Sequence, residues 1–92
     1  MNKETIIIRL QKIERYFQKH SETNPSFLPE WKAAQWINTT IESTEFLTIM
    51  HFREMLTHLK TTEQSEHYNG AGWLDFKLHF KGLLHQYGLT VD

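Results

Sequence analysis

The sequence predicts an all-α protein, a small bundle of about four helices that forms a single domain over residues 1–92. Four segments repeat apolar residues at intervals of three and four, the spacing that places them on one face of a helix. Runs rich in Ser, Thr, Asn, Pro and Gly separate these segments and predict turns. The chain has no cysteine, so neither disulfides nor thiolate metal sites supplement its one hydrophobic core.

The first expected helix covers residues 3–20. Its inward positions recur at steps of four, three and four: Ile6, Leu10, Ile13 and Phe17. Asn2 precedes the segment and is a residue type that caps helix N-termini. Glu4 lies in the first turn, where a negative charge interacts favourably with the helix dipole. The residues at its start and the apolar period therefore indicate the same helix.

A turn over residues 21–28 separates this helix from a second one, expected over residues 29–42. Pro29 suits the first turn of a helix because its missing N–H would have no partner there. The inward positions are Ala33, Trp36, Ile37 and Ile41. β-Branched residues are frequent towards Ile41, so a short extended stretch is the alternative for that end.

The third expected helix covers residues 45–60, with Ser43 or Thr44 as its cap. The apolar stripe consists of Phe46, Ile49, Phe52, Leu56 and Leu59. Leu47, Met50 and Met55 broaden that stripe, and a broad apolar surface is typical of a central helix. We therefore expect this helix to be the most buried of the four.

A polar run over residues 61–72 predicts a loop of about a dozen residues, near the upper end for compact domains. The fourth expected helix follows over residues 73–87. Its inward positions are Trp73, Phe76, Phe80, Leu83, Leu84 and Tyr87. Gly88 is a natural terminator after the last turn, and Leu89 and Val91 are expected to pack back on the bundle.

One group of residues on the third helix has metal-binding chemistry. His51, Glu54 and His58 are spaced at i, i+3 and i+7, so all three project from one stripe. Imidazole and carboxylate groups are suitable ligands for zinc or iron. The alternative is a solvated polar face opposite the apolar stripe, and we expect that alternative, with no cofactor.

The same helix contains an arginine followed by four residues and a histidine. Arg53 and His58 have this spacing, and so do Arg15 and His20 on the first helix. The pattern is similar to the short motif of the all-helical HEPN ribonucleases. That resemblance implies that the His acts on a ribose 2′-hydroxyl while the Arg stabilises phosphate charge. The sequence departs from the family at the residue after the Arg, which is Glu or Tyr here.

The charges are evenly balanced, with a formal net charge of −1. Residues 1–46 hold six charges of each sign, and residues 47–92 hold four positive and five negative ones. Nucleic-acid binding usually requires a basic excess, so a nucleic-acid-binding regulator is the less favoured class. No segment is apolar over the length of a signal peptide or a membrane span, and we expect a cytoplasmic protein that does not bind membranes.

These observations favour a non-enzymatic protein-protein interaction module, such as an adaptor, an inhibitor or an accessory subunit. Aromatic residues make up 13% of the chain and are typical of interface cores. Trp31 lies about 140° from Trp36 around the second helix, so the two cannot share an inward face. We therefore expect a protein partner or a homodimer that contacts Trp31 and Trp73. A nuclease or metal protein that uses the third helix is the alternative.

Overall fold

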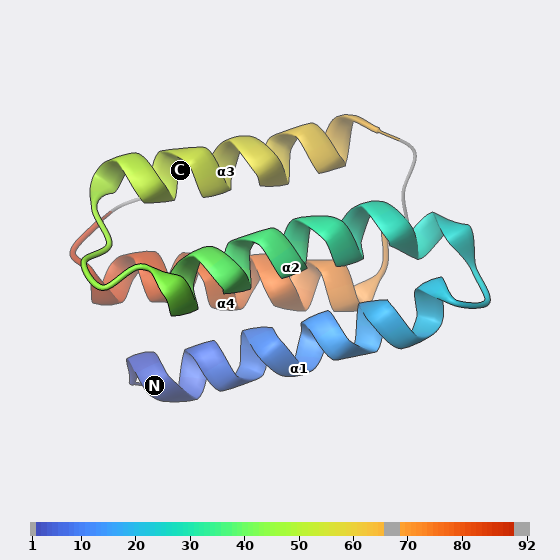
Figure 1. The fold of residues 1–92 in the computed structure, drawn as a ribbon, viewed down its shortest axis with the longest axis horizontal. Helices are drawn as coiled ribbons and strands as arrows, with labels where there is room; N and C mark the ends of the chain where they lie inside the picture. The colour runs from blue at the N-terminus through green and yellow to red at the C-terminus, as the bar shows by residue number, and fades with distance from the viewer. Residues whose placement is uncertain (1, 66–68, 90–92) are drawn as a thin grey trace.

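The computed structural model describes residues 2–65 and 69–89 and forms a bundle of four α-helices (Figure 1). The helices are α1 (Lys3–Ser21), α2 (Leu28–Ser43), α3 (Ile49–Gln64) and α4 (Ala71–Gln86), and a 3-10 turn, η1 (Pro25–Phe27), precedes α2. This part of the chain contains no strand, so the predicted fold class is confirmed. None of its helices combines the length and apolar character needed to cross a membrane.

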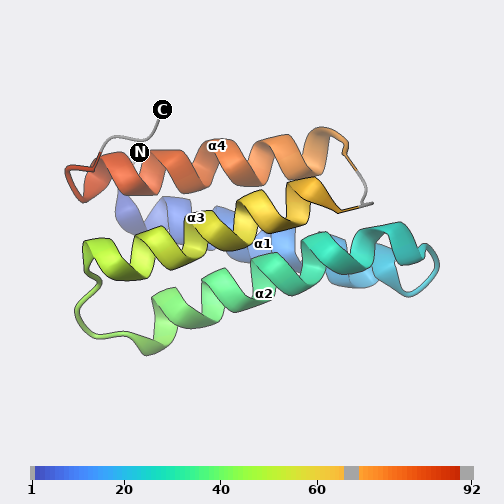
Figure 2. The ribbon, with the colours of Figure 1, turned by 90° about the horizontal axis from the view of Figure 1, so that it is seen from above.

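Successive helices run in opposite directions, and α1 and α3 lie on opposite sides of the bundle with α2 and α4 between them (Figures 1 and 2). The backbone of α1 lies close to both α2 and α4. Gly72 permits the close approach to α4, because a Cβ atom there would lie 3.2 Å from ring atoms of Tyr16 and Phe17. In contrast, α3 contacts α4 through large side chains such as Phe52, whose ring centroid lies 6.4 Å from that of Phe80.

Helix α1 confirms the first prediction at both ends and along its inward face. The backbone N–H of Thr5 donates a hydrogen bond to Asn2 Oδ1 at 2.8 Å, so Asn2 is the cap. The four buried residues are the four of the predicted stripe: Ile6, Leu10, Ile13 and Phe17. A regular apolar period with a capping residue was therefore sufficient to place this helix.

Helix α2 continues to Ser43, so the alternative of an extended stretch before that residue is wrong. Trp36 is half-buried rather than inward, whereas Asn38, which the apolar pattern ignored, is buried. Its Nδ2 donates hydrogen bonds to the carbonyl oxygen of Leu10 at 3.1 Å and to Glu14 Oε1 at 2.7 Å. The amide nitrogen is paired in this way and joins α1 to α2, while Asn38 Oδ1 is buried with no hydrogen-bond partner among the described residues.

Helix α3 begins four residues later than predicted and also ends four residues later. The predicted caps were wrong because residues up to Ser43 still belong to α2, and Thr48 caps α3 instead. As a result, Phe46 precedes the helix and lies outside the core, and Ile49 is also exposed. The buried residues of α3 are Phe52, Met55, Leu59 and Thr62. The later end shortens the predicted loop, of which residues 66–68 lie outside the described part.

Helix α4, not α3, presents the most deeply buried face, so the prediction of a central third helix is wrong. Five residues of the predicted stripe have 0% exposure on α4: Trp73, Phe76, Phe80, Leu83 and Leu84. The sixth, Tyr87, is half-buried and follows the helix. After the last turn Gly88 has a φ of +75°, a left-handed conformation that favours glycine, as predicted. Leu89 packs against the core, while Val91 lies outside the described residues.

Candidate functional site

The three residues of the predicted metal stripe on α3 do not converge on one point. The Nδ1 atom of His51 accepts a hydrogen bond from the backbone N–H of Thr48 at 2.9 Å, so this imidazole caps the helix. Glu54 is exposed, and the ring of His58 lies against another side chain. Across the described residues, no group of three or more His, Cys, Asp or Glu side chains could hold a metal ion. In the part of the chain that the structure describes, these three side chains therefore do not gather into a common ligand set.

The Arg53 and His58 pair is also separated in the structure. Residues five apart differ by about 140° around a helix, and no hydrogen bond or ion pair joins these two in the described part of the chain. His58 stacks on Trp36 of α2, with ring centroids 3.9 Å apart and planes inclined by 21°. The imidazole thus covers an aromatic ring at the junction of α2 and α3, away from the guanidinium.

Arg15 and His20, the second pair with this spacing, are also separated from each other. The His20 ring lies 4.3 Å from the ring of Tyr16 and stacks on Phe27 at 5.3 Å. It closes the end of the bundle where α1 meets the 3-10 turn. Arg15 lies on the exposed surface of α1. Neither copy of the motif therefore brings its arginine and histidine together within one chain.

The two tryptophans expected at a binding surface have different positions. Trp31 is half-buried and packs against the core of its own chain, and a contact between Trp31 and a partner stays a prediction. Trp73 has 0% exposure and stacks on Phe76, with ring centroids 6.2 Å apart. Trp73 therefore has no surface to offer a partner.

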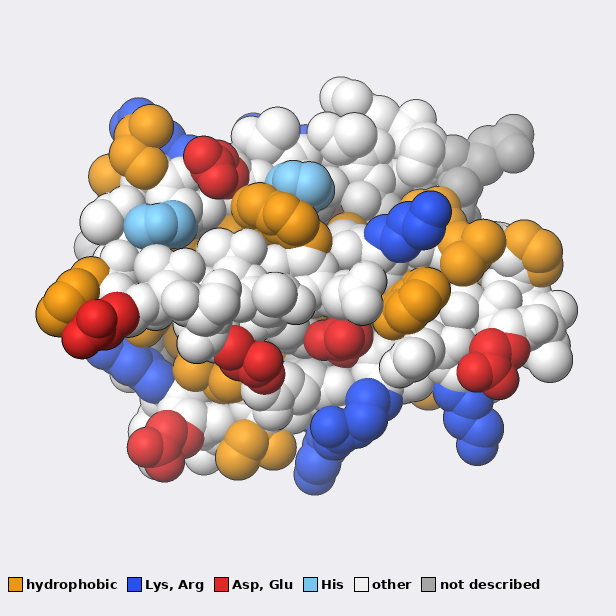
Figure 3. All heavy atoms as spheres, viewed as in Figure 1, with side chains coloured by type: hydrophobic (Ala, Val, Ile, Leu, Met, Phe, Trp, Pro, Cys, Tyr) orange, Lys and Arg blue, Asp and Glu red, His pale blue; other side chains and the backbone are white. Residues whose placement is uncertain are grey.

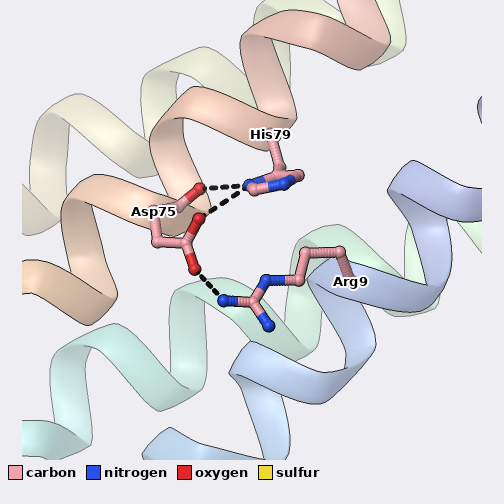
Figure 4. Close-up of polar contacts among 3 residues, drawn as sticks. All are labelled: Arg9, Asp75 and His79. Atoms are coloured by element: carbon pink, nitrogen blue, oxygen red, sulfur yellow. Dashed lines mark hydrogen bonds and ion pairs between the residues drawn. The ribbon is translucent and has the colours of Figure 1, made fainter. Parts of the chain in front are cut away.

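A polar cluster that the sequence revealed only in part joins α1 to α4. Figure 4 shows Asp75 of α4 between Arg9 of α1 and His79, which lies one turn further along α4. Asp75 accepts a hydrogen bond from Arg9, and its Oδ1 lies 2.8 Å from His79 Nδ1. Asp75 and His79 are four residues apart, a spacing at which side chains on a helix meet, whereas nothing in the sequence places Arg9 beside them. The cluster holds two helices together at a partly exposed position.

Two grooves border α1, and both are small. The groove between α1 and the start of α4 has a volume of about 260 Å³ and is lined in part by Lys12 and Tyr16. The groove between α1 and α2 has a volume of about 270 Å³ and is lined in part by Glu14 and Glu42. Ligand pockets usually enclose about 300–1,000 Å³, so neither groove resembles an enclosed small-molecule site.

Three large apolar side chains are exposed within five residues of the chain. Phe46 is 77% exposed, Ile49 49% and Met50 59%, and we call this group the apolar end patch. Figure 3 shows hydrophobic side chains at the left end of the molecule, over the connection between α2 and α3 and the start of α3. Between the patch residues, Leu47 packs against the core and Thr48 caps α3. The patch therefore lies on a segment whose middle residues are held in place by the core and by the helix cap.

The sequence contained part of the signal for this patch. All three residues were expected in or beside the inward stripe of the third helix. Phe46 lies outside because α3 begins after it, whereas Ile49 and Met50 are exposed on the first turn of α3 itself. Comparison with protein-family models, curated proteins and solved structures gives no match to this chain.

Proposed function

We propose that the protein is a small non-enzymatic protein-protein interaction module, an adaptor, inhibitor or accessory subunit, that binds its partner through the apolar end patch. The observation that supports this proposal is the exposure of Phe46, Ile49 and Met50 on one short segment. Single exposed apolar residues are ordinary on protein surfaces, whereas adjacent ones mark interaction sites. Phe and Met are also enriched in protein interfaces.

The anchoring of the segment favours tight binding. Leu47 is fixed by the core, and the Thr48–His51 capping box holds the first turn of α3, so the patch is ordered before the partner arrives. Ordering of loops and side chains is one of the main free-energy costs of association, and part of this ordering is present in the segment before it binds. Phe46 would be the central anchor, since its ring offers about 150–250 Å² to a partner.

Site-specific photo-crosslinking in the native host tests the proposal. A benzophenone-bearing phenylalanine replaces Phe46, and a matched variant carries the same group at Thr23, which is exposed in the connection between α1 and η1, at the other end of the bundle (Figure 1). We expect a crosslinked protein of defined mass from position 46 and none from position 23. The crosslinked protein is then identified by mass spectrometry.

The purified partner provides the decisive step. We expect Phe46→Asp to weaken its binding at least tenfold, because the substitution places a charge where an apolar pocket closes on the ring. Sedimentation of the purified chain alone distinguishes a second copy from a different protein as the occupant. Crosslinks of equal yield from both positions, or full affinity in Phe46→Asp, would remove the basis for the proposal.

A further inference from the structure

The fold sorts the charges of α1 so that they differ from one face to the other, although the chain as a whole is balanced. Between Glu4 and Glu22 this helix has one carboxylate, Glu14, and it is turned towards α2, where it accepts a hydrogen bond from Asn38 at 2.7 Å. The cations of the same stretch are Arg9, Lys12, Arg15 and Lys19, all exposed. The outer face of α1 is therefore basic along most of its length.

Three of these cations form one strip. At 100° per residue, Lys12, Arg15 and Lys19 lie within about 60° of one another around the helix. None of the three takes part in an ion pair in the described part of the chain, whereas Arg9, beside them, is paired with Asp75. Figure 3 shows Lys and Arg side chains projecting from the lower edge of the molecule, where α1 runs. We call these three residues the basic strip.

We infer that the basic strip is a docking surface for an acidic, amphipathic helical segment of another protein. With a rise of 1.5 Å per residue, the three charges are separated by about 4.5 and 6 Å along the axis. Carboxylates at i, i+3 and i+7 of a helix have the same spacing, so a helix lying along α1 could pair all three. Ile8, 51% exposed and one turn before Lys12, offers an apolar contact at the end of the strip.

The same surface is less suited to a nucleic acid. Single strands bind through cations together with aromatic rings on which bases stack. Tyr16 is the aromatic residue beside the strip, and its ring lies among those of Phe17, His20 and Phe27, at centroid distances of 5.9, 4.3 and 6.1 Å. It is held by intramolecular packing, and three cations alone give a strand few phosphate contacts.

Fluorescence anisotropy with a synthetic probe tests the inference. The probe is a labelled helical peptide with glutamates along one face and leucine beside them, and its control has glutamine in place of every glutamate. We expect the intact protein to bind the glutamate peptide and not the glutamine peptide, with an affinity that falls as salt is added. A labelled single-stranded RNA is measured under the same conditions.

Two triple variants with the same net charge separate position from total charge. Lys12→Glu, Arg15→Glu and Lys19→Glu together reverse the strip. Lys32→Glu, Arg53→Glu and Lys60→Glu reverse three exposed cations on α2 and α3. We expect the first variant to lose about tenfold or more in affinity for the glutamate peptide and the second to lose much less.

Three results would overturn the inference: no binding of the glutamate peptide at low salt, equal losses in both variants, or tighter binding of the RNA than of the peptide. Circular dichroism confirms that both variants remain helical. The inference does not depend on the apolar end patch, since Phe46→Asp is expected to leave peptide binding unchanged. Failure here and failure of the proposed function are therefore distinguishable.

Discussion

Helices α1 and α3 have similar apolar content but differ in which of their apolar residues are buried. On α1 the predicted stripe is the buried face, and it packs between α2 and α4. On α3 and the residues before it, the predicted stripe is divided: Phe52 and Leu59 are buried, whereas Phe46 and Ile49 face solvent. Phe46 faces solvent because α3 begins only after it, whereas Ile49 is exposed on the first turn of α3 itself.

The comparison shows where function is to be sought in a small helical protein. Apolar residues that complete the core have a structural reason to be present, which the fold itself explains. Adjacent apolar residues that the fold leaves outside have no such reason, and they are the best candidates for binding. On α3 these are the residues of the apolar end patch, and α1 offers a charged face instead.

The largest expected effect concerns the core side of α1. Phe17 has 0% exposure and lies 6.3 Å from the ring of Trp73 and 6.4 Å from that of Phe76. We expect Phe17→Ala to lower the free energy of unfolding by about 3–5 kcal/mol, because the lost burial is accompanied by a cavity. Urea denaturation measures this change.

Ile8→Ala on the outer face of the same helix serves as the control and is expected to cost less than about 0.5 kcal/mol. A similar loss in both variants would mean that α1 does not divide into a core face and a solvent face.

The buried amide between α1 and α2 gives the next effect. Asn38→Leu removes the donor to Leu10 and Glu14, and we expect it to destabilise the protein by about 1–3 kcal/mol. Unfolding in urea at neutral pH is the measurement. An unchanged or higher stability would show that packing, rather than the amide hydrogen bonds, holds these two helices together.

Loss of the side chain that caps α3 is expected to have a smaller effect on stability than the two substitutions above. We expect Thr48→Ala to cost about 1 kcal/mol, the usual value for loss of an N-cap side chain. Thr61→Ala, an exposed threonine in the body of α3, is the matched control with an expected change near zero. If Thr44→Ala were the costly substitution, α3 would begin where the sequence first suggested.

How well the sequence predicted each helix boundary depends on the residue that caps it. Asn2 caps the start of α1, and Gly88 follows the end of α4. Few other residues of a capping type stand near either position, so α1 and the end of α4 were predicted correctly. Three potential caps, Ser43, Thr44 and Thr48, stand within six residues before α3, and the sequence does not rank them. The distinguishing signal was His51, which fills the place that Glu or Gln usually takes in a capping box.

The candidate surfaces were predicted less well for a different reason. Counting charges along the chain hides their positions in space, since Glu14 faces α2 while Lys12 and Arg15 face solvent. A helical projection of residues 3–20 would have shown the basic strip. In contrast, no local pattern could reveal Arg9 beside Asp75, because that contact depends on how α1 and α4 pack.

The smallest expected effect is that of this partly exposed ion pair. A double-mutant cycle with Arg9→Met and Asp75→Asn is expected to give a coupling of about 0.2–1 kcal/mol, reduced by added salt. Thermal unfolding of the four proteins supplies the cycle. A coupling that is larger and insensitive to salt would make this cluster, rather than the core, the main link between α1 and α4.

The most direct test of the central claim compares two phenylalanines of the one stripe that the sequence predicted. Phe46 is 77% exposed and Phe52 is 2% exposed. In urea denaturation we expect Phe46→Ala to change the free energy of unfolding by less than about 0.5 kcal/mol and Phe52→Ala to lower it by about 3–5 kcal/mol. Comparable losses would contradict the account, because Phe46 would then belong to the core and the apolar end patch would not exist.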